Sequence, residues 1–350
     1  MNVHSTHVLD ASVFSRIPKD GFSNSRLLVV GDLMLDRYVV GEVTRISPEA
    51  PVPVLAMRKE RTVAGGAANV ALNITGLRAN VIVAGVIGRD AAAARLIEIL
   101  SQNGISDDCI MEDLTRPTTS KTRVMCDNHQ IVRIDSEATQ DLSQEIAAEL
   151  STRIEALLDE RVDAVLLSDY AKGVLTCQLT REIITGCLSR DIPVLVDPKR
   201  LDYTRYLGAT LITPNQKEFE TALGTMSIPL GNIGASGALL RNRLNCETLL
   251  VTQGAHGMTA ITSDHFHHFP ALAEEVFDVS GAGDTVIATV GTCLAAGLDV
   301  ISAVQVANVA ASLVVRRAGT VPVEWEDLYV TISQHCECAT QETVARARVG

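Results

Sequence analysis

The segment Asp278-Val-Ser-Gly-Ala-Gly-Asp284 joins a glycine-rich turn to a carboxylate, and an apolar stretch follows it directly. A glycine-rich turn that opens a helix leaves unpaired backbone N–H groups at the positive end of the helix dipole, which is a site for anions. Asp284 places a carboxylate beside the bound anion, where it suits a proton acceptor or a ligand of metal-bound water. An ordinary helix start with an acidic first turn fits the same residues. This segment alone favours neither interpretation.

Five polar residues stand where short apolar stretches end. In a parallel sheet, the carboxyl ends of the strands lie at one edge, and open α/β sheets bind their ligands there. Asp and Asn are also ordinary turn residues, so one of them alone would mean little. Five together predict a ligand site at that edge. The five are Asp32, Asp169, Asp197, Asn215 and Thr252.

Apolar stretches typical of buried strands alternate with stretches of helical spacing along most of the chain. The strands are expected at 27–31, 80–88, 164–169, 193–197 and 248–252. The helices are expected at 64–77, 91–103, 142–158, 177–190, 284–296 and 300–316. A helix that carries Glu218 and two further helices should precede the last of these strands. This alternation predicts an α/β fold with a doubly wound, mostly parallel sheet flanked by helices.

Two β-prone segments, 36–62 and 117–136, contain no helix of their own. The first is marked by prolines, which favour sheet edges, and the second holds the turn Asp127-Asn-His between two strands. We therefore expect a small accessory sheet outside the main one. The expected division of the chain is a flexible extension at 1–24, one domain at 25–330 and a tail at 331–350.

The composition restricts the classes of partner and compartment. A net charge of -12 argues against nucleic acid or an anionic membrane as the main partner, so an anionic substrate would need local Lys and Arg. The 8 cysteines show no paired zinc spacing and no compact disulfide pattern, which favours reduced thiols. No apolar stretch has the roughly 18 uncharged residues of a membrane span, and no signal pattern opens the chain. We expect a cytoplasmic protein.

The usual nucleotide-binding fingerprints are missing. The sequence contains neither G-x-x-x-x-G-K-[ST] nor a G-x-G-x-x-G that follows a strand. What remains is the helix-end anion site with Asp284, and a second carboxylate, Glu218, one turn beyond Asn215. That pair could orient a hydrated Mg²⁺ on nucleotide phosphates, since Mg²⁺ keeps several of its waters.

Three motifs in this order, spread over about residues 26–320, resemble those of the ribokinase-like (PfkB) sugar kinases. They are Gly65-Gly66-Ala-Ala-Asn69, Asn215-x-x-Glu218 and Asp278-x-x-Gly-Ala-Gly-Asp284. The resemblance implies a ribokinase-like fold whose small sheet is a lid over the sugar. It implies that Asp284 is the base for the sugar hydroxyl and that the N–H groups of Gly281, Ala282 and Gly283 form the anion hole. We expect the helix N-terminus to lower the pKa of Asp284 and keep it ionised.

The resemblance also implies ATP as co-substrate and Mg²⁺ as cofactor, with Glu218 holding the metal through water. The nucleotide residues that it implies are Asn215, Gln216, Lys217, Glu218, Thr252, Gly254, Gly257 and Asn308. Packing in the core explains Asn308 nearly as well. A K⁺ ion near Asp278 is implied at the level of the family only.

Within the family, three segments resemble the bacterial D-glycero-β-D-manno-heptose 7-phosphate kinases. They are Gly31-Asp-Leu-Met-Leu-Asp-Arg-Tyr38, Arg45-Ile-Ser-Pro-Glu-Ala-Pro-Val-Pro-Val54 and Asp169-Tyr-Ala-Lys-Gly173. Such enzymes phosphorylate the anomeric hydroxyl to give the 1,7-bisphosphate, on the route to ADP-heptose for lipopolysaccharide core. Many are fused to a nucleotidyltransferase module with an H-x-G-H motif. This motif is missing here, so a stand-alone kinase is expected.

The resemblance makes Asp32 the ligand of the sugar hydroxyls, with Gly65, Gly66 and Asn69 beside it. The 7-phosphate of the sugar needs cations far from Asp284. Lys172 is the first candidate, followed by Arg123, Lys121 and Arg89, although each also fits a solvated surface charge. The resemblance implies a homodimer that pairs through the lids, and the exposed edges of the lid strands offer a suitable surface for it.

Two other functions fit the same motifs. One is a different sugar-phosphate or nucleoside kinase of the family; an aromatic content of only 3% and the cations near the lid disfavour a nucleoside. The other is a sugar- or nucleotide-binding regulator that lacks catalysis. The intact Gly-Ala-Gly-Asp284 disfavours it, since a regulator has no use for the base.

Overall fold

The computed structural model describes residues 3–4, 11–126, 129–273, 275–317 and 319–335. The first two residues of the expected turn at 127–129 and the tail beyond 335 lie outside this part of the chain. Within the described part, no helix combines the length and the apolar character that a membrane crossing requires.

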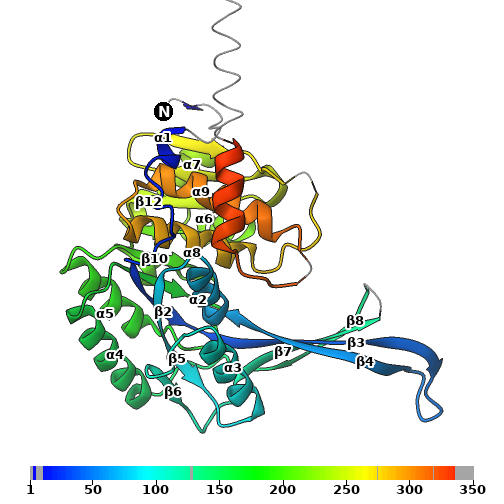
Figure 1. The fold of residues 1–350 in the computed structure, drawn as a ribbon. Helices are drawn as coiled ribbons and strands as arrows, with labels where there is room; N and C mark the ends of the chain where they lie inside the picture. Colours follow the sequence, from blue (N-terminus) through cyan, green and yellow to red (C-terminus); the bar gives the residue numbers. More distant parts are fainter. Residues whose placement is uncertain (1–2, 5–10, 127–128, 274, 318, 336–350) are drawn as a thin grey trace, which may run out of the picture.

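A mixed sheet of ten strands forms the centre of the described structure (Figure 1). In spatial order, its strands are β1 (Val3–His4), β14 (Phe266–Phe269), β13 (Met258–Ile261), β12 (Thr248–Thr252), β11 (Leu211–Ile212), β10 (Val194–Asp197), β9 (Ala164–Ser168), β2 (Arg26–Gly31), β5 (Asn80–Ile87) and β6 (Ile110–Glu112). Only β13 runs antiparallel to its neighbours among these described strands. The predicted α/β class with a mostly parallel sheet is confirmed.

Helices cover both faces of this sheet. They are α1 (Ala11–Phe14), α2 (Ala67–Gly76), α3 (Ala91–Gln102), α4 (Gln144–Asp159), α5 (Cys177–Leu188), α6 (Gln216–Thr225), α7 (Ile233–Leu244), α8 (Ala282–Ala295) and α9 (Val300–Val314), together with the 3-10 turns η1 (Tyr203–Tyr206) and η2 (Gly254–His256) and a helix over 325–335. One apolar cluster joins α2, α3, α8 and α9 to the sheet, and a second joins α4, α5, α6 and α7 to the opposite face.

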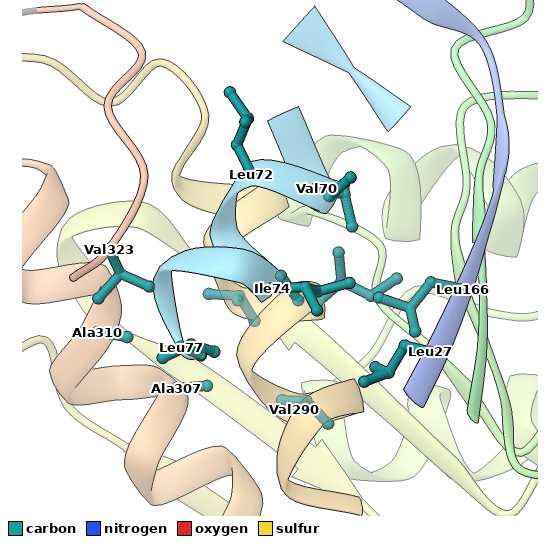
Figure 2. Close-up of a cluster of buried hydrophobic side chains, with 14 of the residues drawn as sticks. Leu27, Val70, Leu72, Ile74, Leu77, Leu166, Val290, Ala307, Ala310 and Val323 are labelled. Carbon is teal, nitrogen blue, oxygen red and sulfur yellow. The ribbon is translucent and has the colours of Figure 1, made fainter. Parts of the chain in front are cut away.

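The strand β2 shows why its sequence is apolar throughout. Leu27 and Val29 point into the first cluster, Leu28 and Val30 into the second, and all four side chains are fully buried. In Figure 2, Leu27 packs beside residues of β9, α2 and α8. These contacts fix the helices α2 and α8 next to each other at the carboxyl edge of the sheet.

A second sheet of four described strands projects from the body as an arm (Figure 1). Its strands, in spatial order, are β4 (Pro53–Gly66), β3 (Leu33–Ile46), β7 (Thr119–Cys126) and β8 (His129–Ser136). The predicted small second sheet is therefore confirmed. Its strands β3 and β4 reach farther inward than the expected 36–62, so that β3 begins directly after Asp32 and β4 ends at the start of α2.

Two local predictions differ from the structure. One helix, α7, lies between α6 and β12 where two were expected, because Pro229 and Gly231 lie in a non-helical connection. Residues 11–24 pack against the body where a flexible extension was expected. In this segment Phe22 is buried, and its ring meets that of Trp325 edge-on with 5.3 Å between centroids.

Candidate active site

The strand ends that the sequence singled out form a continuous row. The strands β2, β9, β10, β11 and β12 are consecutive neighbours, so their carboxyl ends share one edge of the sheet. The N–H of Asp32 donates to the carbonyl of Ser168 at 3.1 Å, and that of Asp169 donates to the carbonyl of Asp197 at 3.1 Å. At the other end of the row, Asn215 and Thr252 form an isolated bridge.

The helix α8 begins at this edge. Its N-cap Gly281 has φ 79°, and a Cβ there would lie 3.0 Å from the amide nitrogen of Asn69, so glycine is required. The N–H of Ala282 donates to the carbonyl of Val279 at 3.2 Å and is thus engaged in a turn. The N–H of Gly283 lies in the first turn, which has no carbonyl partner within the helix. A Cβ on Gly283 would meet no atom within 4 Å, so the space beside it is open.

Asp284 is the third residue of α8, and its side chain is buried. Its Oδ2 atom accepts a hydrogen bond of 2.6 Å from the amide of Asn69, and its Oδ1 atom accepts one of 2.6 Å from the hydroxyl of Tyr170. Asn73 braces this arrangement, because its amide donates to the carbonyl of Asn69 and its oxygen accepts from the hydroxyl of Thr285. The sequence predicted Asn69 and Asp284 for the site but not Tyr170 or Asn73.

Burial raises the pKa of Asp284 to about 6, and the nearby charge of Asp36 adds to the increase. The hydrogen bonds from Asn69 and Tyr170 act in the opposite direction but are outweighed. The expectation of a lowered pKa is therefore wrong, because the loss of water outweighs the hydrogen bonds that favour the ionised form. A carboxylate with this pKa is ionised for most of the time at neutral pH and remains basic enough to accept a proton.

The carboxylate of Asp32 is bonded to backbone N–H groups, whereas a ligand of the sugar hydroxyls was expected to face the sugar site. Its buried carboxylate accepts hydrogen bonds from the backbone N–H groups of Tyr170 at 2.8 Å, Lys172 at 3.0 Å and Val174 at 3.1 Å. Burial and the charge of Asp169 raise the pKa of Asp32 to about 6. In the structure, this carboxylate fixes the loop 170–174 instead of facing open space.

Asp36, four residues later on β3, is a second carboxylate near the carboxyl end of β2. It is buried, and its Oδ1 atom accepts a hydrogen bond of 2.6 Å from Arg123 on the neighbouring lid strand β7. A Cβ on Gly65 would lie 2.6 Å from its Oδ2 atom. Gly66 is required for another reason, since it has φ 57°. The glycine pair thus lets the end of β4 pass close to the side chain of Asp36 on the neighbouring strand β3.

The four cations expected at the sugar phosphate fall into three groups. Lys172 and Lys121 both approach the carboxylate of Glu137, at 2.7 Å and 3.6 Å, and the three side chains are largely buried at the base of the lid. Arg123 is paired with Asp36, and its guanidinium lies over the ring of Tyr38 at 5.3 Å from the centroid. Arg89 pairs with Glu112 on the outer surface, with 71% of its side chain exposed. The structure brings Lys121 and Lys172 together and leaves Arg89 apart.

The Asn215-x-x-Glu218 motif forms a capping box at the start of α6. The side chain of Asn215 accepts from the N–H of Glu218 at 3.0 Å, and Glu218 accepts from the N–H of Asn215 at 2.9 Å. The other oxygen of Glu218 meets the ammonium of Lys199 at 2.5 Å. Gln216 and Lys217 are exposed in the first turn. The spacing of the motif therefore has a structural reason that is independent of any nucleotide.

Of the other expected nucleotide residues, Thr252, Gly254 and Gly257 lie on β12 and the turn that follows it, whereas Asn308 lies on α9. Gly254 and Gly257 have φ 56° and 83°, and a Cβ on Gly257 would lie 2.0 Å from the carbonyl of Phe269. The buried amide of Asn308 donates to the carbonyl of Pro270 at 2.9 Å. Asn308 thus holds the chain at Pro270, as expected for a core residue.

Asp197, at the end of β10, interacts electrostatically with Asp284 and Glu218. Burial raises the pKa of Asp197 well above its usual range, with further contributions from Asp284 and Glu218. Among the described residues, no three His, Cys, Asp or Glu side chains are arranged to hold a metal ion directly. Asp278, by contrast, binds the N–H groups of Ser280 and Gly319, both at 2.9 Å, and these bonds lower its pKa.

Comparison with known proteins agrees with this geometry. The model of a family described as pfkB family carbohydrate kinase matches residues 24–327. The chain is 44% identical over 321 residues to a bifunctional protein HldE of Methylobacillus flagellatus, covering 92% of this chain and 64% of the relative. It is 42% identical over 310 residues to an HldE of Pelobacter propionicus, covering 88% and 62%. The chain thus spans somewhat less than two thirds of the length of these relatives.

Two solved structures share the fold. A ribokinase of Arabidopsis thaliana, complexed with ribose and ATP, aligns with a TM-score of 0.68 at 20% identity over 88% of this chain and 98% of its own. Phosphofructokinase-2 of Escherichia coli, in complex with potassium, aligns with a TM-score of 0.71 at 17% identity over 88% and 99%. At these identities the likeness establishes the architecture.

Proposed function

The chain belongs to the pfkB family of carbohydrate kinases, and from this premise we propose that it phosphorylates the anomeric hydroxyl of D-glycero-β-D-manno-heptose 7-phosphate. The product would be the 1,7-bisphosphate, a precursor of ADP-heptose and of lipopolysaccharide core. The observation that carries the proposal is the buried carboxylate of Asp284, held by Asn69 and Tyr170 at the N-terminus of α8.

Asp284 is the general base of the proposed reaction. It accepts the proton of the C1 hydroxyl while the sugar oxygen attacks the γ-phosphorus of ATP, and the bond from that phosphorus to the bridging oxygen of ADP breaks. The open N-terminal turn of α8, with Gly281, Ala282 and Gly283, positions the phosphoryl group and stabilises its charge. Because the N–H of Ala282 is engaged with Val279, the N–H of Gly283 is the stronger candidate donor.

ATP lies, in this proposal, along the carboxyl ends of β11 and β12. The residues assigned to it are Asn215, Gln216, Lys217, Glu218, Thr252, Gly254, Gly257 and Asn308. Kinases of this family use ATP with a divalent metal ion, which we assign as Mg²⁺. The carboxylate of Glu218, at the start of α6, suits a metal held through its waters, and the ion would neutralise charge on the phosphates. The backbone turn at Asp278 is the candidate site for K⁺.

The sugar lies between the lid and α8 in this proposal. Asp36, Asn69 and the glycine pair Gly65-Gly66 border it, while Asp32 acts through the loop that it fixes. The 7-phosphate binds Lys172 and Lys121, where the carboxylate of Glu137 now holds the two ammonium groups together. Arg123 contributes through its pair with Asp36, and the exposed position of Arg89 makes it the weakest of the four candidates.

The lid is also the proposed dimer surface. Along its strands, large apolar side chains are exposed in the single chain: Ile46, Met57, Ile131, Val132 and Ile134. The outer strand β8 additionally offers unpaired backbone groups at the edge of the sheet. Pairing of two lids would cover these apolar side chains and the edge of β8, and it would exclude water from the phosphoryl group.

A panel of acceptors tests the proposed function. Release of ADP is measured with heptose 7-phosphate, hexose phosphates, pentose phosphates and the unphosphorylated sugars. We expect the highest kcat/KM for heptose 7-phosphate. Preference for another sugar phosphate would assign a different substrate within the family, and absence of turnover with every acceptor would identify a binding protein without catalysis.

A further inference from the structure

Both oxygens of Asp284 have a hydrogen-bond donor before any sugar hydroxyl arrives. Asn69 donates to one oxygen from the first turn of α2, and Tyr170 donates to the other from a loop 114 residues away in sequence. The sequence motifs of the site include Asn69, whereas Tyr170 has no role in the reaction described above. Its position against the reacting carboxylate therefore requires an explanation.

Hydrogen bonds and close backbone contacts hold the loop that carries Tyr170. The carboxylate of Asp32 accepts the N–H of Tyr170, and that of Asp169 accepts the N–H of Ala171 at 2.8 Å. Ala171 has φ 57°, a left-handed conformation that a residue with a Cβ rarely adopts. A Cβ on Gly173 would lie 1.9 Å from the carbonyl of Gln140. These constraints hold the phenol in one place.

The charged and titratable groups around Asp284 come from every element packed against it. Asn69 of α2 and Tyr170 of the loop are donors, whereas Asp36 of β3 and Asp197 of β10 are acids. Burial and the charge of Asp284 raise the pKa of the Tyr170 phenol well above its usual range. The phenol therefore keeps its proton and stays a donor over the whole working range of pH.

We propose that Tyr170 is a positioning residue for the base: its hydroxyl holds the carboxylate of Asp284 in one orientation and favours the ionised form. The inference rests on the proposed function, in which Asp284 accepts the proton of the sugar hydroxyl. Tyr170 gains and loses no proton in the reaction. It counters part of the effect of burial and of the charge of Asp36, which oppose a charge on Asp284.

Tyr170→Phe removes the hydroxyl and keeps the ring. The readout is kcat/KM as a function of pH, which reports the pKa of the essential base in the free enzyme. The acid limb of this profile, where kcat/KM falls as the base becomes protonated, should shift to a pH about one unit higher. Compared with the wild type, kcat/KM should then be roughly tenfold lower below about pH 6 and should recover above about pH 8. Tyr206→Phe is the matched control, because its buried hydroxyl donates to a different carboxylate, Asp169, at 2.7 Å. Its acid limb should stay at the wild-type position.

An equal loss of activity at every pH, or an unchanged acid limb, would overturn the inference. Folding of each variant is checked by circular dichroism. If Tyr170→Phe does not fold, 3-fluorotyrosine at position 170 replaces it, since a more acidic phenol is a stronger donor and should move the acid limb down. Failure of the proposed function gives another result: wild-type protein without turnover, or Asp284→Asn with undiminished turnover.

Discussion

A Cβ atom on Gly65 would lie 2.6 Å from the Oδ2 atom of Asp36, whose other oxygen is paired with Arg123. Gly65 on β4 and Asp36 on β3, neighbouring strands of the lid, therefore depend on each other. Asp36 in turn raises the pKa of Asp284. The lid thus contributes directly to the electrostatics of the base.

Gly65→Ala should displace the carboxylate of Asp36 and weaken its bond to Arg123. A hydrogen bond between charged groups contributes about 1.5–3 kcal/mol, so we expect KM for the sugar to rise by about tenfold or more. The fold should persist, because the clash is confined to one side chain. The control is Gly224→Ala, where the new Cβ meets no atom within 4 Å and the helix α6 should gain stability. An unchanged KM in Gly65→Ala would contradict the assignment of Asp36 to the sugar site.

Glu137→Gln should strengthen the binding of the sugar phosphate. The carboxylate of Glu137 competes with the phosphate for Lys172 and Lys121, because the three side chains lie together, largely buried, at the base of the lid. We expect KM for heptose 7-phosphate to fall roughly two- to fivefold, with KM for ATP unchanged. Lys172→Ala should have the opposite effect on the same constant. Arg153→Ala, at an exposed pair with Glu149 on α4, is the control.

A rise of KM for heptose 7-phosphate in Glu137→Gln would show that Glu137 orients the lysines rather than competing with the phosphate. Equal effects of Lys172→Ala on both substrates would remove Lys172 from the phosphate site.

Asp284→Asn should be more stable than the wild type at neutral pH. The pKa of Asp284 rises from 3.8 to about 6 on folding, so the folded state favours its protonated form. The stability that this provides is complete below about pH 4 and is lost as the pH rises through about 6. An amide mimics the protonated group at every pH. We expect a gain of up to about 3 kcal/mol at pH 7.5, measured by thermal unfolding, which disappears toward about pH 4.

Asp299→Asn provides a control of opposite sign for this measurement. Hydrogen bonds from Ser302 and the pair with Arg16 lower the pKa of Asp299 to about 2, despite its partial burial. Its contribution is present above about pH 4 and is lost as the pH falls through 2. Asp299→Asn should therefore lose stability at neutral pH. A lower melting temperature of Asp284→Asn at pH 7.5 would contradict the raised pKa of the base.

Ile134→Glu should convert a lid-paired dimer into monomers. Ile134 is 57% exposed on the outer strand β8, and a dimer through this face would bury the new charge. Light scattering should give the mass of one chain for the variant and of two chains for the wild type. Leu230→Glu, at a site 72% exposed in the connection before α7, should remain a dimer. A monomeric wild type would exclude the proposed dimer.

The sequence predicted those features that depend on neighbouring residues. Alternating strands and helices, the second sheet and the helix start at Asp284 follow from local periodicity and from glycine. Contacts between segments that are distant in the chain could not be predicted from local sequence patterns. Tyr170 meets Asp284 across 114 residues, and Asp32 binds the N–H of Lys172 across 140. The pKa of Asp284 was predicted in the wrong direction for the same reason, since its burial depends on segments far away in the chain.

Single-turnover phosphoryl transfer from ATP to heptose 7-phosphate tests the role of Asp284 most directly. Asp284→Asn should retain the fold and the affinity for ATP, while the rate of transfer falls by roughly 10²- to 10⁴-fold, as expected when a general base is removed. A rate within about tenfold of the wild type, with ATP binding intact, would contradict the account of this site.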